Sequence, residues 1–207
     1  MNVFTILFLI ISLQSPLVAQ DTLKEYYTDG KLKSEGVVVK GIKNGTWKFY
    51  YPNQIISAEE NYKDDFLNGT RKTYDFDGRL MSIENWEEGM EEDSSFSFYS
   101  NGQVHRKGVF KDGLYDGIWD VFYENGKLKH RGAYKEGNPE GFWTFWNEEG
   151  VKDREGYYKQ GKKNGRWLIY SNKTGKLEWE GDYFDDAQKG NWILYDKKGE
   201  VKKKFVY

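Results

Sequence analysis

The chain has 207 residues and no cysteine, and its 31 basic and 33 acidic side chains leave a net charge of -2. This balance argues against a nucleic-acid partner, which needs long-range attraction to phosphate, and the missing cysteine excludes disulfides and a lipid-bearing N-terminal cysteine. Aromatic residues make up 18% of the chain, and at about 150–250 Å² of buried surface each they must supply most of the core.

The first twenty residues, MNVFTILFLIISLQSPLVAQ, carry no charged side chain. Their apolar run from Val3 to Leu13 is too short to cross the ~30 Å hydrocarbon layer of a bilayer, so we interpret residues 1–20 as a signal peptide. An uncleaved anchor is the alternative, because no Lys or Arg precedes the run. We expect an exported protein, in the periplasm, in the cell envelope or secreted, with no transmembrane segment after signal cleavage.

From residue 21 onward the sequence repeats itself every 24 residues. One phase of the repeat is marked by a turn glycine, replaced once by glutamine and shifted once by a single inserted residue: Gly30, Gln54, Gly78, Gly102, Gly126, Gly150, Gly175 and Gly199. A second phase carries a tryptophan, replaced in units two and three: Trp47, Arg71, Ser95, Trp119, Trp143, Trp167 and Trp192. A fixed period over this length indicates a repeat architecture.

Each unit contains two turn signals. Asp29-Gly30 and Asn101-Gly102 represent one series, and Asn44-Gly45 and Asp116-Gly117 represent the other. Such dipeptides favour tight hairpins, and segments such as TWKFYY are rich in residues that favour strands. We therefore predict an all-β fold: an elongated single-layer antiparallel β-meander of about seven units, forming one repeat domain over residues 21–207 and roughly 70 Å long at ~4.8 Å per strand.

A third glycine recurs inside the first strand of a unit, at Gly36, Gly108, Gly132, Gly156 and Gly181. Glycine weakens a strand unless something occupies the space of the missing side chain. We expect a neighbouring Trp ring to cover it, so that Trp47, Trp119, Trp143, Trp167 and Trp192 are structural. A further row two residues beyond this glycine, mostly aromatic, should add cross-strand ladders: Val38, Tyr62, Trp86, Phe110, Tyr134, Tyr158 and Tyr183.

The unit G-x-W-x-x-Y, Y-x-N-G-K-L, x-G-x-Y-x-x-G, as in GTWKFY at 45–50 and YENGKLKHRGAYKEG at 123–137, resembles the bacterial variant of the MORN repeat. The resemblance covers essentially the whole chain after residue 20. It implies a β-meander that acts as a scaffold or binding surface, often in exported proteins of Gram-negative bacteria, and some relatives are labelled antitoxins of toxin-antitoxin pairs. Units two and three depart from the pattern at Gln54, Arg71, Asp93 and Ser95.

Catalytic chemistry finds little support in the sequence. His105 and His130 occupy different phases of neighbouring units and should point to opposite faces, and no His-x-x-x-His or Glu-x-x-His spacing occurs. The carboxylates of IENWEEGMEED could bind Ca²⁺ or serve glycoside hydrolysis, but a run of charges is more typical of a solvated face. Asp64-Asp65 and Asp185-Asp186 are expected in turns. We predict no enzyme, no metal site and no cofactor.

The prediction is a non-enzymatic repeat protein whose extended surface binds another protein. Because positions that break a repeat are often functional, the candidate binding residues are Arg71, Glu91, Glu92, Asp93 and Ser95. One alternative is a cell-wall or polysaccharide-binding module that stacks sugar rings on exposed aromatic rows. A further alternative, implied by the resemblance, is an antitoxin-like protein that neutralises a partner toxin.

Overall fold

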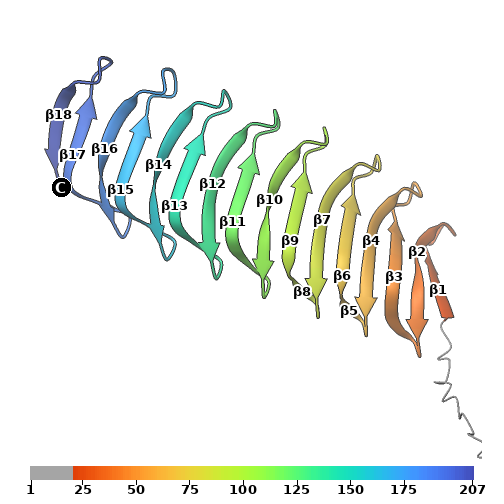
Figure 1. The fold of residues 1–207 in the computed structure, drawn as a ribbon. Helices are drawn as coiled ribbons and strands as arrows, with labels where there is room; N and C mark the ends of the chain where they lie inside the picture. Colours follow the sequence, from red (N-terminus) through yellow and green to blue (C-terminus); the bar gives the residue numbers. More distant parts are fainter. Residues whose placement is uncertain (1–20) are drawn as a thin grey trace, which may run out of the picture.

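A computed structural model describes residues 21–207; the predicted signal peptide lies outside the described residues. The described chain forms one open antiparallel sheet in which the strands pair side by side in chain order, as a meander (Figure 1). The units follow one another along an elongated ribbon (Figure 1). The prediction of an all-β, single-layer meander is confirmed.

The sheet comprises 18 strands within residues 21–207. Their bounds are β1 (Asp21–Tyr26), β2 (Leu32–Val39), β3 (Ile42–Tyr50), β4 (Ile56–Lys63), β5 (Phe66–Leu67), β6 (Gly69–Tyr74), β7 (Leu80–Glu87), β8 (Met90–Glu91), β9 (Asp93–Phe98), β10 (Val104–Lys111), β11 (Leu114–Phe122), β12 (Leu128–Lys135), β13 (Asn138–Trp146), β14 (Lys152–Lys159), β15 (Lys162–Tyr170), β16 (Leu177–Phe184), β17 (Ala187–Tyr195) and β18 (Val201–Val206). We number the units from the β2–β3 hairpin to the β16–β17 hairpin. Units two and three differ from the others because their second strand is interrupted, between β5 and β6 and between β8 and β9.

One of the two predicted turns is in the wrong place. The Asp-Gly series does form the turn between units, since Gly30 N–H donates to the carbonyl of Tyr27. The second turn, expected at Asn44-Gly45, lies four residues earlier, at Lys40 and Gly41, both of which adopt positive φ (53° and 82°). Two residues with positive φ match the right-handed twist of a hairpin.

Gly45 instead forms a β-bulge. On β2 and β3, Gly36 is opposite Trp47 but Val37 is opposite Asn44, so two residues of β3 have no partner on β2. The positive φ of Gly45 (68°) accommodates this bulge. The Trp47 indole N–H then donates to the carbonyl of Val37 at 3.0 Å, which provides a partner for a backbone group where the ladder opens.

Tryptophan covers glycine in five units. A Cβ atom added at the glycine inside the strand would lie 2.0–2.3 Å from the indole of the facing Trp, so no other residue fits beneath the ring. These tryptophans are no more than 3% exposed. We call the side of the sheet on which they lie the indole face: Trp47, Trp119, Trp143, Trp167 and Trp192.

Edge-to-face aromatic contacts link neighbouring units on the indole face. Tyr158 is roughly perpendicular to both Trp143 and Trp167, with ring centroids 5.5 and 5.2 Å apart. Tyr183 continues the row between Trp167 and Trp192 at 5.9 and 5.0 Å. Each such pair adds about 0.5–1.5 kcal/mol beyond the area it buries. The core of this single layer is therefore a ladder of aromatic rings along the ribbon.

Candidate functional site

The aromatic ladder is interrupted in units two and three. Where other units place glycine opposite tryptophan, unit two has Glu60 and Arg71, and unit three has Glu84 and Ser95. The strand pairing keeps these residues in the same row across the sheet, because Trp47 is opposite Glu60, Arg71 is opposite Glu84 and Ser95 is opposite Gly108. A polar segment thus stands in the middle of the apolar row.

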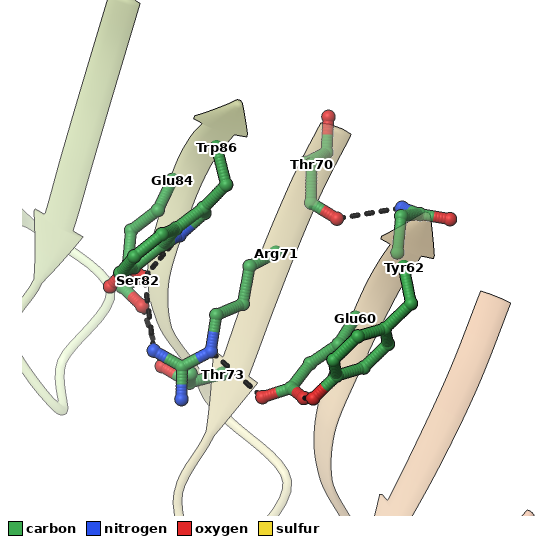
Figure 2. A network of polar contacts seen from close by, with 9 residues as sticks. Glu60, Tyr62, Thr70, Arg71, Thr73, Ser82, Glu84 and Trp86 are labelled. Atoms are coloured by element: carbon green, nitrogen blue, oxygen red, sulfur yellow. Dashed lines mark hydrogen bonds and ion pairs between the residues drawn. The ribbon is translucent and has the colours of Figure 1, made fainter. Parts of the chain in front are cut away.

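Arg71 bridges the two glutamates, as Figure 2 shows. Its Nε donates to Glu60 Oε1 at 2.9 Å, and its Nη1 donates to Glu84 Oε2 at 3.0 Å. Tyr62 Oη donates to the other oxygen of Glu60 at 2.6 Å, and Trp86 Nε1 donates to Glu84 at 3.2 Å. Each carboxylate therefore accepts bonds from both a cation and an aromatic side chain, which offsets its desolvation.

Burial and hydrogen bonding shift the pKa values in this cluster. Burial disfavours the charged guanidinium, but the bonds to Glu60 and Glu84 outweigh it and hold the pKa of Arg71 above its usual value. Burial, reinforced by the bond to Glu60, raises the pKa of the Tyr62 hydroxyl. Glu60 is 8% exposed. The Arg71 side chain is 30% exposed, so the cluster is a half-buried ionic network, with one more negative than positive charge.

Glu91 lies next to this network, in β8, the first part of the interrupted second strand of unit three. It is opposite Trp86, and burial together with the nearby charge of Glu84 raises the pKa of its carboxyl, while a hydrogen bond with Ser95 and the charges of Arg106 and Arg71 oppose that rise. Ser95 is only 5% exposed. Of the predicted binding residues, the structure therefore brings Arg71, Glu91 and Ser95 together.

Glu92 and Asp93 have backbone roles. The carboxylate of Glu92 accepts a bond from the N–H of Asp112 in the next hairpin at 2.6 Å. Asp93 occupies the bulge position that is glycine in other units, and it adopts the same positive φ (62°). Neither side chain has a bond to Arg71 in the described part of the chain, so the predicted set divides into a polar cluster and a backbone element.

The surface beside Arg71 is hollowed. A depression of about 620 Å³ is lined by Ala58, Thr73 and Arg71 together with aromatic side chains that include Phe49 and Phe76. The Ala58 position is also small in units one and three and larger in units four to seven: Ser34, Ser82, Arg106, His130, Arg154 and Trp179. The ionic network therefore lies beside an open depression whose lining is largely aromatic.

A family model for the MORN repeat variant matches residues 22–39, 43–64, 94–112 and 115–136. Four segments of the chain thus match this repeat. Each match consists of a second strand, the turn between units and the first strand of the next unit. The matches leave out residues 65–93, the segment that contains Arg71, Glu84 and Glu91, and also residues 137–207, where the Gly–Trp contacts are intact.

No curated protein sequence matches this chain. Two solved structures that overlap it are titled "Crystal Structure of TcdB2-TccC3-Cdc42" and "Crystal Structure of TcdB2-TccC3-TEV". Both are 11% identical, and the overlaps cover 90% and 89% of this chain but only 12% of those chains, with TM-scores of 0.25 and 0.24. Overlaps with such low TM-scores do not establish a common fold.

Sequence reasoning missed Glu60 and Glu84 as members of the site. A signal was present, because both occupy the phase of Gly36 and Gly108 in the MORN unit, and Arg71 and Ser95 occupy the phase of their tryptophans. A pair of substitutions at two positions known to face each other indicates a replaced contact. The repeat aligned the four residues, but only the pairing of the strands showed that they form one network.

The other side chains considered for catalysis or metal binding do not come together in one site. His130 packs against Trp143 and Phe145, whereas His105 contacts Tyr99; burial lowers the pKa of both imidazoles. His105 lies at a bulge, where the strict alternation of faces assumed for it does not hold. Within residues 21–207 no group of three or more potential metal ligands occurs, and that segment has no helix long and apolar enough to span a membrane.

The predicted turn aspartates do lie in turns. Asp64, Asp65, Asp185 and Asp186 all adopt positive φ between 49° and 69°. The Asp65 and Asp186 carboxylates accept backbone N–H bonds from Lys43 and Lys163 in the preceding hairpins of the MORN ribbon. These carboxylates therefore hold adjacent hairpin ends together.

Proposed function

We propose that this protein is a non-enzymatic scaffold that binds another protein through the interrupted part of its indole face. The observation that supports this is the exchange of the Gly–Trp contact for Glu60–Arg71 and Glu84–Ser95. In the other units the indole fills the row, whereas here a charged network takes its place beside an aromatic-lined depression. A charged network next to an aromatic-lined depression supplies both contact area and directional bonds.

The charge of this region favours a basic partner surface. Residues 56–98 contain 12 acidic and 4 basic side chains, a net charge of -8, whereas residues 152–207 contain 9 acidic and 14 basic ones, a net charge of +5. The net charge of -2 for the whole chain conceals this separation. A basic partner would be steered to units two and three rather than to the C-terminal units.

The test restores the family pattern. The four substitutions Glu60→Gly, Arg71→Trp, Glu84→Gly and Ser95→Trp rebuild two Gly–Trp contacts; we call this protein the repaired variant. Wild-type and repaired chains lacking residues 1–20 would be used for affinity capture from cell-envelope extracts. The proposal expects a partner that the wild type retains and the repaired variant loses, although the latter stays folded by near-UV circular dichroism. Equal capture by both proteins would disprove the assignment.

Export is part of the same proposal and rests on residues 1–20. Cell fractionation of the full-length chain, followed by N-terminal sequencing, should give a protein outside the cytoplasm that begins near Asp21. Recovery of the uncleaved chain from the membrane would favour the anchor instead.

A glycan-binding role has less support. It relied on exposed aromatic rows, but the five tryptophans of the indole face are buried. Exposed aromatic area lies elsewhere, at Phe142 and Tyr157, whose ring centroids are 5.0 Å apart and which are 47% and 51% exposed. This alternative expects purified cell-wall glycan to bind the wild type and to bind a Phe142→Ala/Tyr157→Ala variant more weakly; a wild type that does not bind the glycan removes it.

A further inference from the structure

An exposed apolar row follows one edge of the ribbon. In units one to four, the first residue after the turn between the two strands of the unit is large and apolar. These four residues are 41–59% exposed: Ile42, Phe66, Met90 and Leu114. The corresponding residues of units five to seven are Asn138, Lys162 and Ala187. Figure 1 shows that the hairpin ends lie along a nearly straight line. We call the four apolar residues the tip row.

Two side chains of the tip row reach toward the next hairpin. A Cβ added at Gly89 would be 3.2 Å from Cδ1 of Phe66, and a Cβ added at Gly137 would be 3.6 Å from Cδ2 of Leu114. Between the hairpin ends of units two and three lies a depression of about 370 Å³, lined by Phe66, Asp64 and Glu88 among others. Large apolar side chains that remain about half exposed at four successive units form a surface of the kind that marks a protein interaction site.

Carboxylates without cationic partners flank this row. Within residues 21–207, Asp64, Glu88 and Asp112 take part in no ion pair. Counted over residues 39–42, 63–66, 87–90 and 111–114, five acidic and three basic side chains give a net charge of -2. The equivalent residues of units five to seven, 135–138, 159–162 and 184–187, have three of each and a net charge of zero. The apolar row and the negative charge thus occur together.

The spacing identifies the partner as a helix. Each unit advances the sheet by two strands, about 10 Å, and seven residues of an α-helix also span about 10.5 Å. A helix lying along the tips would therefore meet one apolar residue per unit with every seventh side chain. Strand addition is not available here, because the tips are turns rather than a free sheet edge, whereas a helix satisfies its own backbone bonds.

We propose that the tip row binds a basic amphipathic α-helix of a partner protein. This inference rests on the proposed scaffold function and adds a second surface to it. Apolar side chains of the helix contact Phe66, Met90 and Leu114, and flanking Lys or Arg residues pair with Asp64, Glu88 and Asp112. The four tips span roughly 30 Å, which corresponds to about 20 residues of helix.

A synthetic 25-residue helix tests this, with Leu at heptad positions and Lys beside them; the control peptide replaces each Lys with Glu. Binding to the chain without residues 1–20 is measured by fluorescence anisotropy. The test variant is Phe66→Asn/Met90→Asn/Leu114→Asn, which copies Asn138 of unit five and should fold. The matched control, Lys162→Asn/Ala187→Asn, changes the same position in units six and seven.

The wild type should bind the basic helix at least tenfold more tightly than the acidic one, and raising the salt concentration should weaken this binding. The triple asparagine variant should lose at least tenfold, whereas the control variant and the repaired variant should keep wild-type affinity. Absent binding, equal affinity for both peptides, or an unchanged triple variant would overturn the inference while leaving the scaffold function to its own test. A wild-type dimer in sedimentation that the triple variant dissociates would assign the tip row to self-association instead.

Discussion

The indole of Trp143 lies directly over Gly132: a Cβ atom added to Gly132 would be 2.0 Å from Cδ2 of the ring. Trp143 also donates its Nε1 hydrogen to the carbonyl of Ala133, the residue after this glycine, at 3.1 Å. One side chain therefore fills the space above a glycine and provides a partner for the backbone beside it. This relationship makes glycine and tryptophan interdependent in each intact unit.

Gly132→Ala should consequently destabilise the protein by about 2–3 kcal/mol, because the ring must leave its position. The same substitution in a Trp143→Ala background should cost little, since nothing then lies above the added methyl group. Urea denaturation of the two single variants and the double variant gives the coupling. Additive costs would show that the two residues do not depend on each other.

At two positions, a residue other than glycine has a backbone conformation that glycine would adopt with less strain. Gln54 and Asp93 have φ of 68° and 62° at positions that are glycine in most other units. Asp93→Gly and Gln54→Gly should each stabilise the chain by up to about 1 kcal/mol through relief of strain. Thermal unfolding measures the gain. The comparison is Lys72→Gly, in the interior of β6 without positive φ, which should lose stability.

Removal of Arg71 should expose the cost of the buried carboxylates. Arg71→Leu leaves Glu60 and Glu84 without their shared cation, and we expect a loss of about 2–4 kcal/mol at pH 7. The triple variant Glu60→Gln/Arg71→Leu/Glu84→Gln should recover most of the stability, because it leaves no carboxylate without its cation. Urea denaturation at pH 7 compares these proteins with the wild type, and a triple variant no more stable than Arg71→Leu would contradict this account.

Glu91 should make the stability of the protein depend on pH. Burial raises the pKa of its carboxyl above the ordinary value of 4.5 in the folded chain. The charged form is therefore disfavoured by folding, and the penalty is full above the folded pKa and absent below about 4.5. Glu91→Gln should stabilise the protein at neutral pH by less than about 1 kcal/mol and lose this advantage as the pH falls. The exposed Glu87→Gln removes an equal charge and serves as the control; an identical pH profile for both would refute the assignment.

The sequence allowed the meander and the pairing of Gly132 with Trp143 to be predicted, because a glycine and a tryptophan that recur together at fixed spacing must pack together. It did not locate the second hairpin turn. Asn44-Gly45 and Lys40-Gly41 both accept positive φ, and a hairpin turn and a β-bulge both require it, so composition could not assign one to each. Only the strand pairing separates them.

The candidate site was predicted in part for a related reason. Arg71 and Ser95 were visible as substitutions for tryptophan, whereas Glu60 and Glu84 sit among many other surface carboxylates. Their importance depends on which residue each faces across the sheet, and the misplaced turn obscured that relation. The predicted role of the five binding residues stays a prediction until a partner is tested.

Deletion of equal numbers of units tests the central claim most directly. Removing residues 56–103 joins Ile55 to Val104 and eliminates units two and three, and removing 104–151 joins Gln103 to Lys152 and eliminates units four and five; both preserve the 24-residue phase. Affinity for the partner captured by the wild type would be measured for both proteins once circular dichroism shows that they are folded. The account predicts that the first deletion abolishes binding and that the second retains it. Binding that survives the loss of residues 56–103 would contradict it.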